Sequence, residues 1–188
     1  MTARMRRKFQ DGAVAILFLL GMLCPSALAT ERIEEGDVKA AFVLNFIKFV
    51  EWPASAFHAP EDPIMLSVLG HDPTADSLAS LDGKTVSGRR VVVRKVSGLS
   101  ALARCHVLFV GASEKAQLEP ILDAVQRWPV LTIADFEGFA GRGGTIGFLR
   151  RENRVGFEIN EESARKAGLN VSAKLLYLGK TVPGRREG

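Results

Sequence analysis

Short apolar runs rich in β-branched residues alternate along this chain with segments of helical character. Residues 64–69, 91–93, 107–110 and 130–133 are such runs, and an amphipathic segment at 113–126 separates the last two. Near-continuous apolar strands are typical of a parallel sheet covered on both faces, and strands that alternate with helices favour βαβ units. The alternation predicts an α/β fold, a three-layer α/β/α sandwich with a mixed, mostly parallel sheet.

The last third of the sequence changes character after a glycine-rich loop. Two apolar runs, 146–149 and 155–159, flank the polar residues 150–153, which predicts a late antiparallel hairpin. A helix is expected over 161–167, with Gly168 as its C-terminal cap. We therefore expect one α/β domain over residues 30–182 and a loose tail over 183–188.

The segment 34–51 contains no glycine after Gly36 and no proline, and Asp37 is a candidate N-terminal cap. It is predicted to be a helix. Phe42, Phe46 and Phe49 fall on one of its faces, and other apolar residues occupy much of the remainder. Such a helix must be covered on both sides, so it is either a core helix or part of a dimer interface.

The N-terminus has the three-part pattern of a secretory signal peptide. Four basic residues within the first eight precede an apolar run at 13–24, and the small residues Ala27 and Ala29 form a cleavage site. We expect residues 1–29 to be removed. An uncleaved membrane anchor is the alternative, but Pro25 interrupts the run short of the roughly 20 apolar residues that a spanning helix needs.

Removal of this segment lowers the net charge. Four of the 25 basic and one of the 21 acidic residues leave with it, and the formal net charge falls from +4 to +1 over the 159 remaining residues. That balance does not favour a nucleic-acid binder, which needs clustered Lys and Arg. Cys24 is also lost, so Cys105 cannot form an internal disulfide and is predicted to be buried.

The sequence carries no clear signature of an enzyme, a metal site or a cofactor site. The tripeptides at 83–85 and 179–181 resemble the end of a phosphate loop but lack its upstream glycine. The histidines at 58, 71 and 106 lie far apart, and Asp135, Glu137 and Glu158 are candidate acid–base groups only by their position near strand ends. We therefore expect no catalytic residue.

Two alternatives remain open at this point. A small-molecule pocket could form at the carboxyl ends of the strands, from residues 70–74 and 135–139. A hydrolase could be built if His71, Asp72 and Asp135 met in three dimensions.

Three ordered blocks of sequence resemble the YfiR family of periplasmic regulators. The opening block is VKAAF at 38–42 with Asn45-Phe46, Lys48-Phe49 and Trp52-Pro53. The second block extends from Leu131 to Ile146, and the third includes VGFEIN at 155–160, AGL at 167–169 and KLL at 174–176. The resemblance covers nearly all of the chain after residue 29.

Membership of this family implies a soluble periplasmic α/β protein, usually dimeric, that binds the periplasmic sensory domain of an inner-membrane diguanylate cyclase. It implies a repressor of cyclic di-GMP synthesis rather than an enzyme. Members of the family can carry disulfides that link repression to redox state, and the single Cys105 makes such control through an internal disulfide doubtful here.

The family has no short motif that marks its partner contacts, so these are predicted from chemistry. Interfaces combine apolar anchors with a polar rim. The residues with this combination near expected loops are Phe148, Leu149, Arg150, Leu169 and Val171. Ordinary core packing with solvated charge is the alternative for each of them.

Overall fold

The computed structural model describes residues 34–102, 104–151 and 154–183, which belong to one compact unit. The predicted signal peptide, residues 1–29, lies outside the described residues, as does residue 184 onward of the predicted tail. Among the described helices, none is long and apolar enough to cross a membrane.

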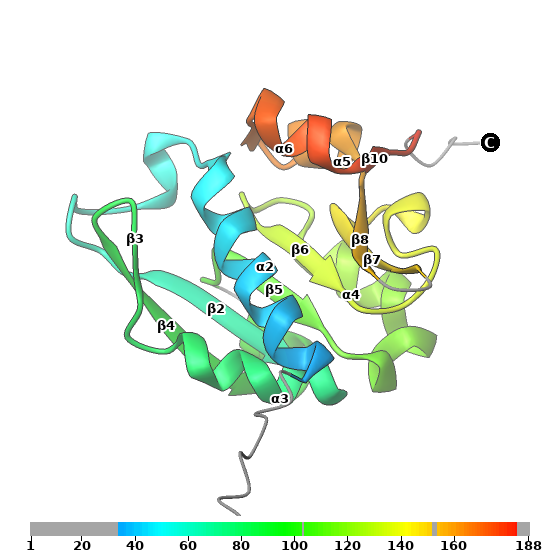
Figure 1. The fold of residues 1–188 in the computed structure, drawn as a ribbon. Helices are drawn as coiled ribbons and strands as arrows, with labels where there is room; N and C mark the ends of the chain where they lie inside the picture. Colours follow the sequence, from blue (N-terminus) through cyan, green and yellow to red (C-terminus); the bar gives the residue numbers. More distant parts are fainter. Residues whose placement is uncertain (1–33, 103, 152–153, 184–188) are drawn as a thin grey trace, which may run out of the picture. The chain divides into compact units, whose positions relative to one another are not determined.

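A mixed sheet of eight strands forms the centre of the fold (Figure 1), with the strand order β10-β8-β7-β6-β5-β2-β4-β3. The strands are β2 (Ile64–Leu69), β3 (Thr85–Val86), β4 (Arg89–Val96), β5 (Val107–Val110), β6 (Leu131–Ala134), β7 (Ile146–Arg151), β8 (Arg154–Ile159) and β10 (Lys180–Thr181). Neighbours are parallel except in the β7–β8 hairpin and the β3–β4 pair. The predicted α/β class, with its late hairpin, is confirmed.

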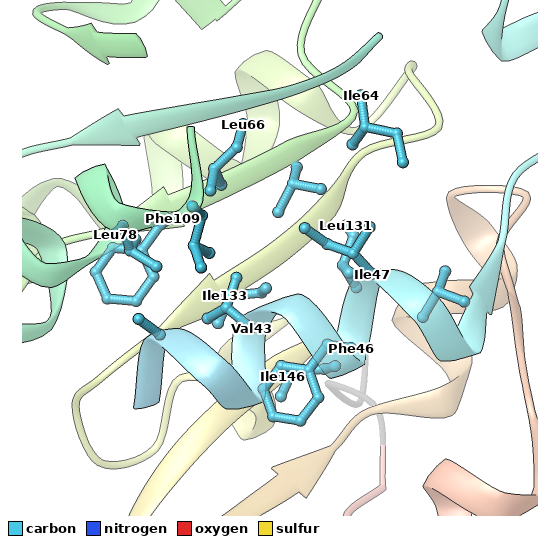
Figure 2. Packing of buried hydrophobic residues seen from close by; sticks show 14 of the residues in the cluster. Val43, Phe46, Ile47, Ile64, Leu66, Leu78, Phe109, Leu131, Ile133 and Ile146 are labelled. Carbon is cyan, nitrogen blue, oxygen red and sulfur yellow. The ribbon is translucent and has the colours of Figure 1, made fainter. Parts of the chain in front are cut away.

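Helix α2 (Glu35–Phe49) covers one face of this sheet. Figure 2 shows Val43, Phe46 and Ile47 directed toward strand residues that include Leu131 and Ile133. Phe46 is fully buried, and its ring centroid lies 4.8 Å from that of Phe157 on β8. The same face is also covered by α3 (Pro73–Ser77) and a following 3₁₀ turn at Leu78–Leu81.

The structure corrects two details of the predicted helix at 34–51. The cap position is Glu34, whose backbone is extended, and Asp37 lies inside the first turn. The chain leaves the helix after Phe49, because the next two residues form strand β1 (Val50–Glu51), which pairs antiparallel with β9 (Asn170–Val171).

The opposite face of the sheet is covered by a 3₁₀ segment, Ala112–Gln117, and by α4 (Leu118–Val125). The single helix predicted at 113–126 is therefore split. Pro120 lies in the first turn of α4, where the absence of its N–H is tolerated. A regular α-helix cannot continue from it toward the N-terminus, because the proline ring would clash with the carbonyl of the preceding turn. Apolar residues of α4 pack on Leu108 and Val110 of β5 and form a second core cluster.

The C-terminal elements follow the hairpin and begin with the predicted helix. Helix α5 (Glu161–Lys166) is capped by the Asn160 side chain and ends before Gly168, whose φ of +71° is the left-handed conformation expected of a glycine cap. Helix α6 (Ala173–Leu178) contacts α2 and leads into β10.

The His106 side chain connects the loop that follows α2 to the sheet through hydrogen bonds. The Met65 N–H donates to Nδ1, so Nε2 carries the proton and donates to the Ala56 carbonyl. The imidazole stacks on Phe57 at a centroid distance of 4.4 Å. Burial lowers the pKa of His106; the Ala56 hydrogen bond and Asp62 oppose this shift, whereas the charge of Arg89 adds to it.

This arrangement predicts stability that falls in mild acid. Well above pH 6.5 the histidine is neutral in both the folded and the unfolded chain. As the pH falls through about 6.5, the unfolded chain binds a proton that folded His106 resists. We expect the free energy of unfolding to decrease from pH 7.5 to pH 5.5, as measured by urea denaturation. His106→Gln should be less stable at pH 7.5 but should show a shallower pH dependence.

The matched control is His71→Gln, which alters an exposed histidine. It should keep the wild-type slope of stability against pH. An equal slope in the wild-type and His106→Gln proteins would contradict the role given to His106.

Candidate functional site

Lys39 is a cation buried under the first turns of α2. Its side chain is only 9% exposed, and its Nζ atom lies 2.8 and 2.9 Å from the two carboxylate oxygens of Asp135 and 2.6 Å from Glu35. Burial alone would lower the pKa of this ammonium group, but the hydrogen bonds and charges of the two carboxylates outweigh burial and raise it. Lys39 is therefore held in its charged form.

Asp135 connects three elements of the fold at the carboxyl end of β6. It follows that strand directly, accepts the hydrogen bonds of Lys39 from α2, and accepts a hydrogen bond of 2.6 Å from the Thr74 hydroxyl of α3. A charge-assisted network in which each member is satisfied fixes the positions of its members. We call these three residues, with Glu35, the Lys39 network.

A cavity of about 400 Å³ opens beside this network. Its lining combines charged and apolar groups: Lys39, Asp135, Phe136, Glu137, Phe148, Leu149 and Arg150. They come from the start of α2, from the loop that directly follows β6 and from residues 148–150 of β7. The cavity therefore lies at the strand ends, where open α/β sheets place their ligands.

Open α/β sheets often bind ligands where the strand order reverses, which in this sheet is between β2 and β5, but the crevice at that point is closed. The His71 N–H donates to the Ser113 hydroxyl, and the Ala112 N–H donates to Asp72. The two loops are so close that a Cβ atom on Gly111 would lie 2.7 Å from the His71 nitrogen. Of the predicted ligand pocket, residues 135–137 line the cavity, whereas residues 70–74 contribute only the Thr74 contact to Asp135.

The structure places the five predicted partner contacts in two regions. Phe148 is in the core at 2% exposure, Leu149 is half-buried and Arg150 is exposed, and all three line the cavity. Leu169, which precedes β9, and Val171, which belongs to it, are both buried. The structure thus makes Arg150 and Leu149 the accessible members, and contact with a partner stays a prediction for all five.

The three phenylalanines of α2 differ in their burial. Phe46 is fully buried, whereas Phe42 and Phe49 are half-buried and pack against the edge of the core. The Lys174 ammonium of α6 lies 5.0 Å from the Phe49 ring centroid. Near this ring, α6 exposes Tyr177 (90%) and Leu178 (60%).

The other candidate groups are accounted for by local structure. His71 is exposed and Asp72 caps α3, so the structure does not assemble the alternative hydrolase site with Asp135. Glu158 is buried against Gly147, which has no side chain and so leaves space for the carboxylate. The described residues contain no cluster of three or more His, Cys, Asp or Glu that could hold a metal ion.

Lys39 was not among the functional candidates predicted from the sequence. A signal was present, because Lys39 interrupts an otherwise apolar part of the helix that contains Val38, Ala40 and Val43. Its partner Asp135 is 96 positions away in the sequence, so the pairing could not be read from local spacing.

We predict that Asp135→Ala lowers the free energy of unfolding by about 2–3 kcal/mol, because it leaves the buried Lys39 with one partner. The control is Asp76→Ala, which breaks an ion pair with Lys95 in which both side chains are about two-thirds exposed. The control should cost no more than about 1 kcal/mol. Urea denaturation measures both, and equal losses would contradict the importance of the Lys39 network.

Comparison with known proteins identifies the family. The family model described as YfiR/HmsC-like matches residues 36–180. Among solved structures, the chain is similar to a conserved domain protein from Vibrio cholerae O1 biovar eltor strain N16961, with 12% identity and a TM-score of 0.54. That likeness covers 78% of this chain and 60% of that chain, and it supports the fold alone.

A search of curated proteins found no match. The family match nevertheless includes nearly all of the described residues and the elements that form the Lys39 network. The chain belongs to the YfiR/HmsC-like family, a regulatory family of periplasmic proteins in diguanylate cyclase signalling.

Proposed function

We propose that this protein binds the periplasmic sensory domain of an inner-membrane diguanylate cyclase and represses cyclic di-GMP synthesis. The observation that carries the proposal is the family match over residues 36–180. The order of the three sequence blocks supports it, since they fall on α2, on the β6–β7 region and on β8 to α6.

The physical mechanism is a shift between two states of the cyclase. A repressor stabilises the inactive state only by the amount by which it binds that state better than the active one. Release of the repressor then restores synthesis on the other side of the membrane. The repressor needs no catalytic group for this, only a surface that distinguishes the two states.

We propose that the protein reaches the periplasm through the cleavable signal at residues 1–29 and acts as a homodimer. The half-buried Phe42 and Phe49, with the exposed Tyr177 and Leu178 of the adjacent α6, supply an apolar face for a second copy. Apolar groups of this kind are enriched in the core of homodimer interfaces.

Redox control through Cys105 has little support. The thiol is buried, donates to the Leu102 carbonyl, and has a pKa raised to about 11, chiefly by burial. Because the thiolate is the reactive form, a thiol of this pKa is inert near neutral pH.

Leu149 and Arg150 are our candidates for contacts at the cavity rim. Arg150 is exposed and Leu149 half-buried, so a partner can reach both without unfolding the hairpin. Phe148 supports them from the core, whereas the buried Leu169 and Val171 belong to the separate β9 region.

Deletion of the gene should raise cellular cyclic di-GMP, and the wild-type gene should restore the lower level. The rise should disappear when the gene for the repressed cyclase is also deleted, which identifies that cyclase. Cyclic di-GMP is measured by mass spectrometry in each strain. An unchanged level in a strain that expresses its periplasm-sensing cyclases would remove the proposed function.

A second candidate function, a small-molecule sensor, is favoured by the cavity beside the Lys39 network. Its volume of about 400 Å³ lies within the usual range for ligand sites, roughly 300–1,000 Å³. Phe148 and Arg150 in its lining suit a ligand with an apolar body and a carboxylate.

A thermal-shift screen with small aromatic and aliphatic carboxylates tests this function. A ligand at 100 times its Kd should stabilise the folded protein by about 2.7 kcal/mol, and Arg150→Ser should abolish the shift. A shift that persists in Arg150→Ser would place the ligand elsewhere, and no shift with any member of the panel would count against a carboxylate sensor.

A further inference from the structure

The two faces of the sheet are covered unequally at β2 and β4. On the side of α2, residues of both strands belong to the main core, including Ile64, Leu66 and Val91. On the side of α4, the second core cluster takes only Leu69 from β2 and only Val96 from β4. The remaining residues of β2 and β4 on the α4 side therefore lie outside both clusters.

Side chains alternate between the two faces of a strand, so the residues on the α4 side can be assigned from the register. Met65 of β2 is opposite Val92 of β4, and Ser67 is opposite Arg94. Met65 and Val92 are half-buried, whereas Arg94 and its neighbour on the same face, Arg90, are exposed.

Arg104 borders the same surface. It is exposed and directly precedes Cys105, which belongs to the second core cluster. Burial raises the pKa of the Cys105 thiol, and the charge of the nearby Arg94 opposes part of this shift. We call Met65, Val92, Arg90, Arg94 and Arg104 the basic sheet face.

The charges on this face are uncompensated within the described part of the chain. Arg90, Arg94 and Arg104 make no ion pair and no side-chain hydrogen bond with its residues. The nearby Asp82 carboxylate accepts from the Val93 N–H at the outer edge of β4, and the adjacent Lys95 points to the other face and pairs with Asp76. Strands of a parallel sheet are normally covered on both sides, and β2 is covered at Ser67, which is 3% exposed. The exposed, positively charged part of the neighbouring β4 is therefore unusual.

We propose that the basic sheet face binds an acidic segment of the cyclase's periplasmic domain, and this rests on the proposed function. Charge complementarity identifies the occupant: carboxylates pair with the arginines, and apolar side chains between them cover Met65 and Val92. An apolar centre with a charged rim is the usual anatomy of a protein interface. Arginine suits the rim because its guanidinium pairs with a carboxylate through two hydrogen bonds.

The same charges could attract an anionic lipid surface, but the shape of the face favours a protein. Its apolar residues, Met65 and Val92, are half-buried within a sheet and flanked by longer arginines. Proteins that lie on membranes insert protruding apolar side chains, usually from an amphipathic helix. A recessed apolar strip is suited to being covered by a partner's side chains.

The test uses the purified protein and the purified periplasmic domain of the cyclase identified by the double deletion. Arg90→Glu/Arg94→Glu should raise the Kd at least about tenfold, since two attractive pairs become repulsive. The control, Arg127→Glu/Arg165→Glu, makes the same change in net charge at exposed sites on α5 and after α4. It should bind within about twofold of the wild type.

Salt and a milder variant sharpen the measurement. Wild-type affinity should weaken from 50 to 300 mM NaCl more than that of Arg90→Glu/Arg94→Glu, because salt screens exposed charges. Arg90→Gln/Arg94→Gln removes charge without reversing it and should give an intermediate Kd. This second variant keeps the test decisive if the glutamate variant fails to fold by circular dichroism.

Three results would overturn the proposal. The first is wild-type affinity of both arginine variants for the cyclase domain. The second is an equal loss of affinity in the control variant. The third is an arginine variant that no longer binds phosphatidylglycerol vesicles but still binds the cyclase domain as the wild type does. In each case the repressor function stands, because the wild-type protein still binds the cyclase. A wild-type protein that does not bind the domain at all would remove both proposals.

Discussion

The packing of α2 on the parallel strands is the contact on which the rest of the structure depends. Burial of a side chain such as Phe46 stabilises the fold by about 2–3 kcal/mol relative to leaving it in water, and α2 buries Val43 and Ile47 beside it. Once the helix is seated, its first turns lie over the carboxyl end of β6 and its end continues into β1.

The Lys39 network follows from that placement. A buried ammonium group costs several kcal/mol unless it is paired, so the helix can bring Lys39 into the interior only where carboxylates meet it. Asp135 and Glu35 supply them, and Thr74 holds Asp135 from the other side. The network therefore fixes α2, α3 and the loop after β6 relative to one another, and it forms one wall of the cavity.

Coverage of the sheet also explains how a small domain can offer more than one surface. The helix α2 protects one face over most strands, whereas α4 reaches mainly β5 and β6. Exposed arginines keep the uncovered part of β4 soluble, as charged side chains do on the edges of many sheets. A regulatory protein can act through surfaces of this kind, because charge complementarity favours one partner over another.

The long elements of the fold could be predicted from the sequence better than the short ones. The strands at β2 and β5 were predicted because their apolar runs are long enough to show a pattern. The two-residue strands β1 and β9 were missed, because a pairing such as Val50 with Val171 depends on residues far apart in the chain. The buried face of α2 was also undetermined, since apolar residues occur on most sides of that helix.

The predicted site residues also divide into features that the sequence predicts and features that depend on contacts between distant elements. Phe148 and Leu149 were both predicted as partner contacts, but they are neighbours in a strand and lie on opposite faces. Only the packing of α2 decided that Phe148 is the buried one. By itself, the sequence determined the α/β class and the family, because alternating apolar runs and ordered blocks are local properties of the chain. Only the tertiary structure decided the pairing of Lys39 with Asp135 and the uncovered face of β4, because both depend on which distant elements come into contact.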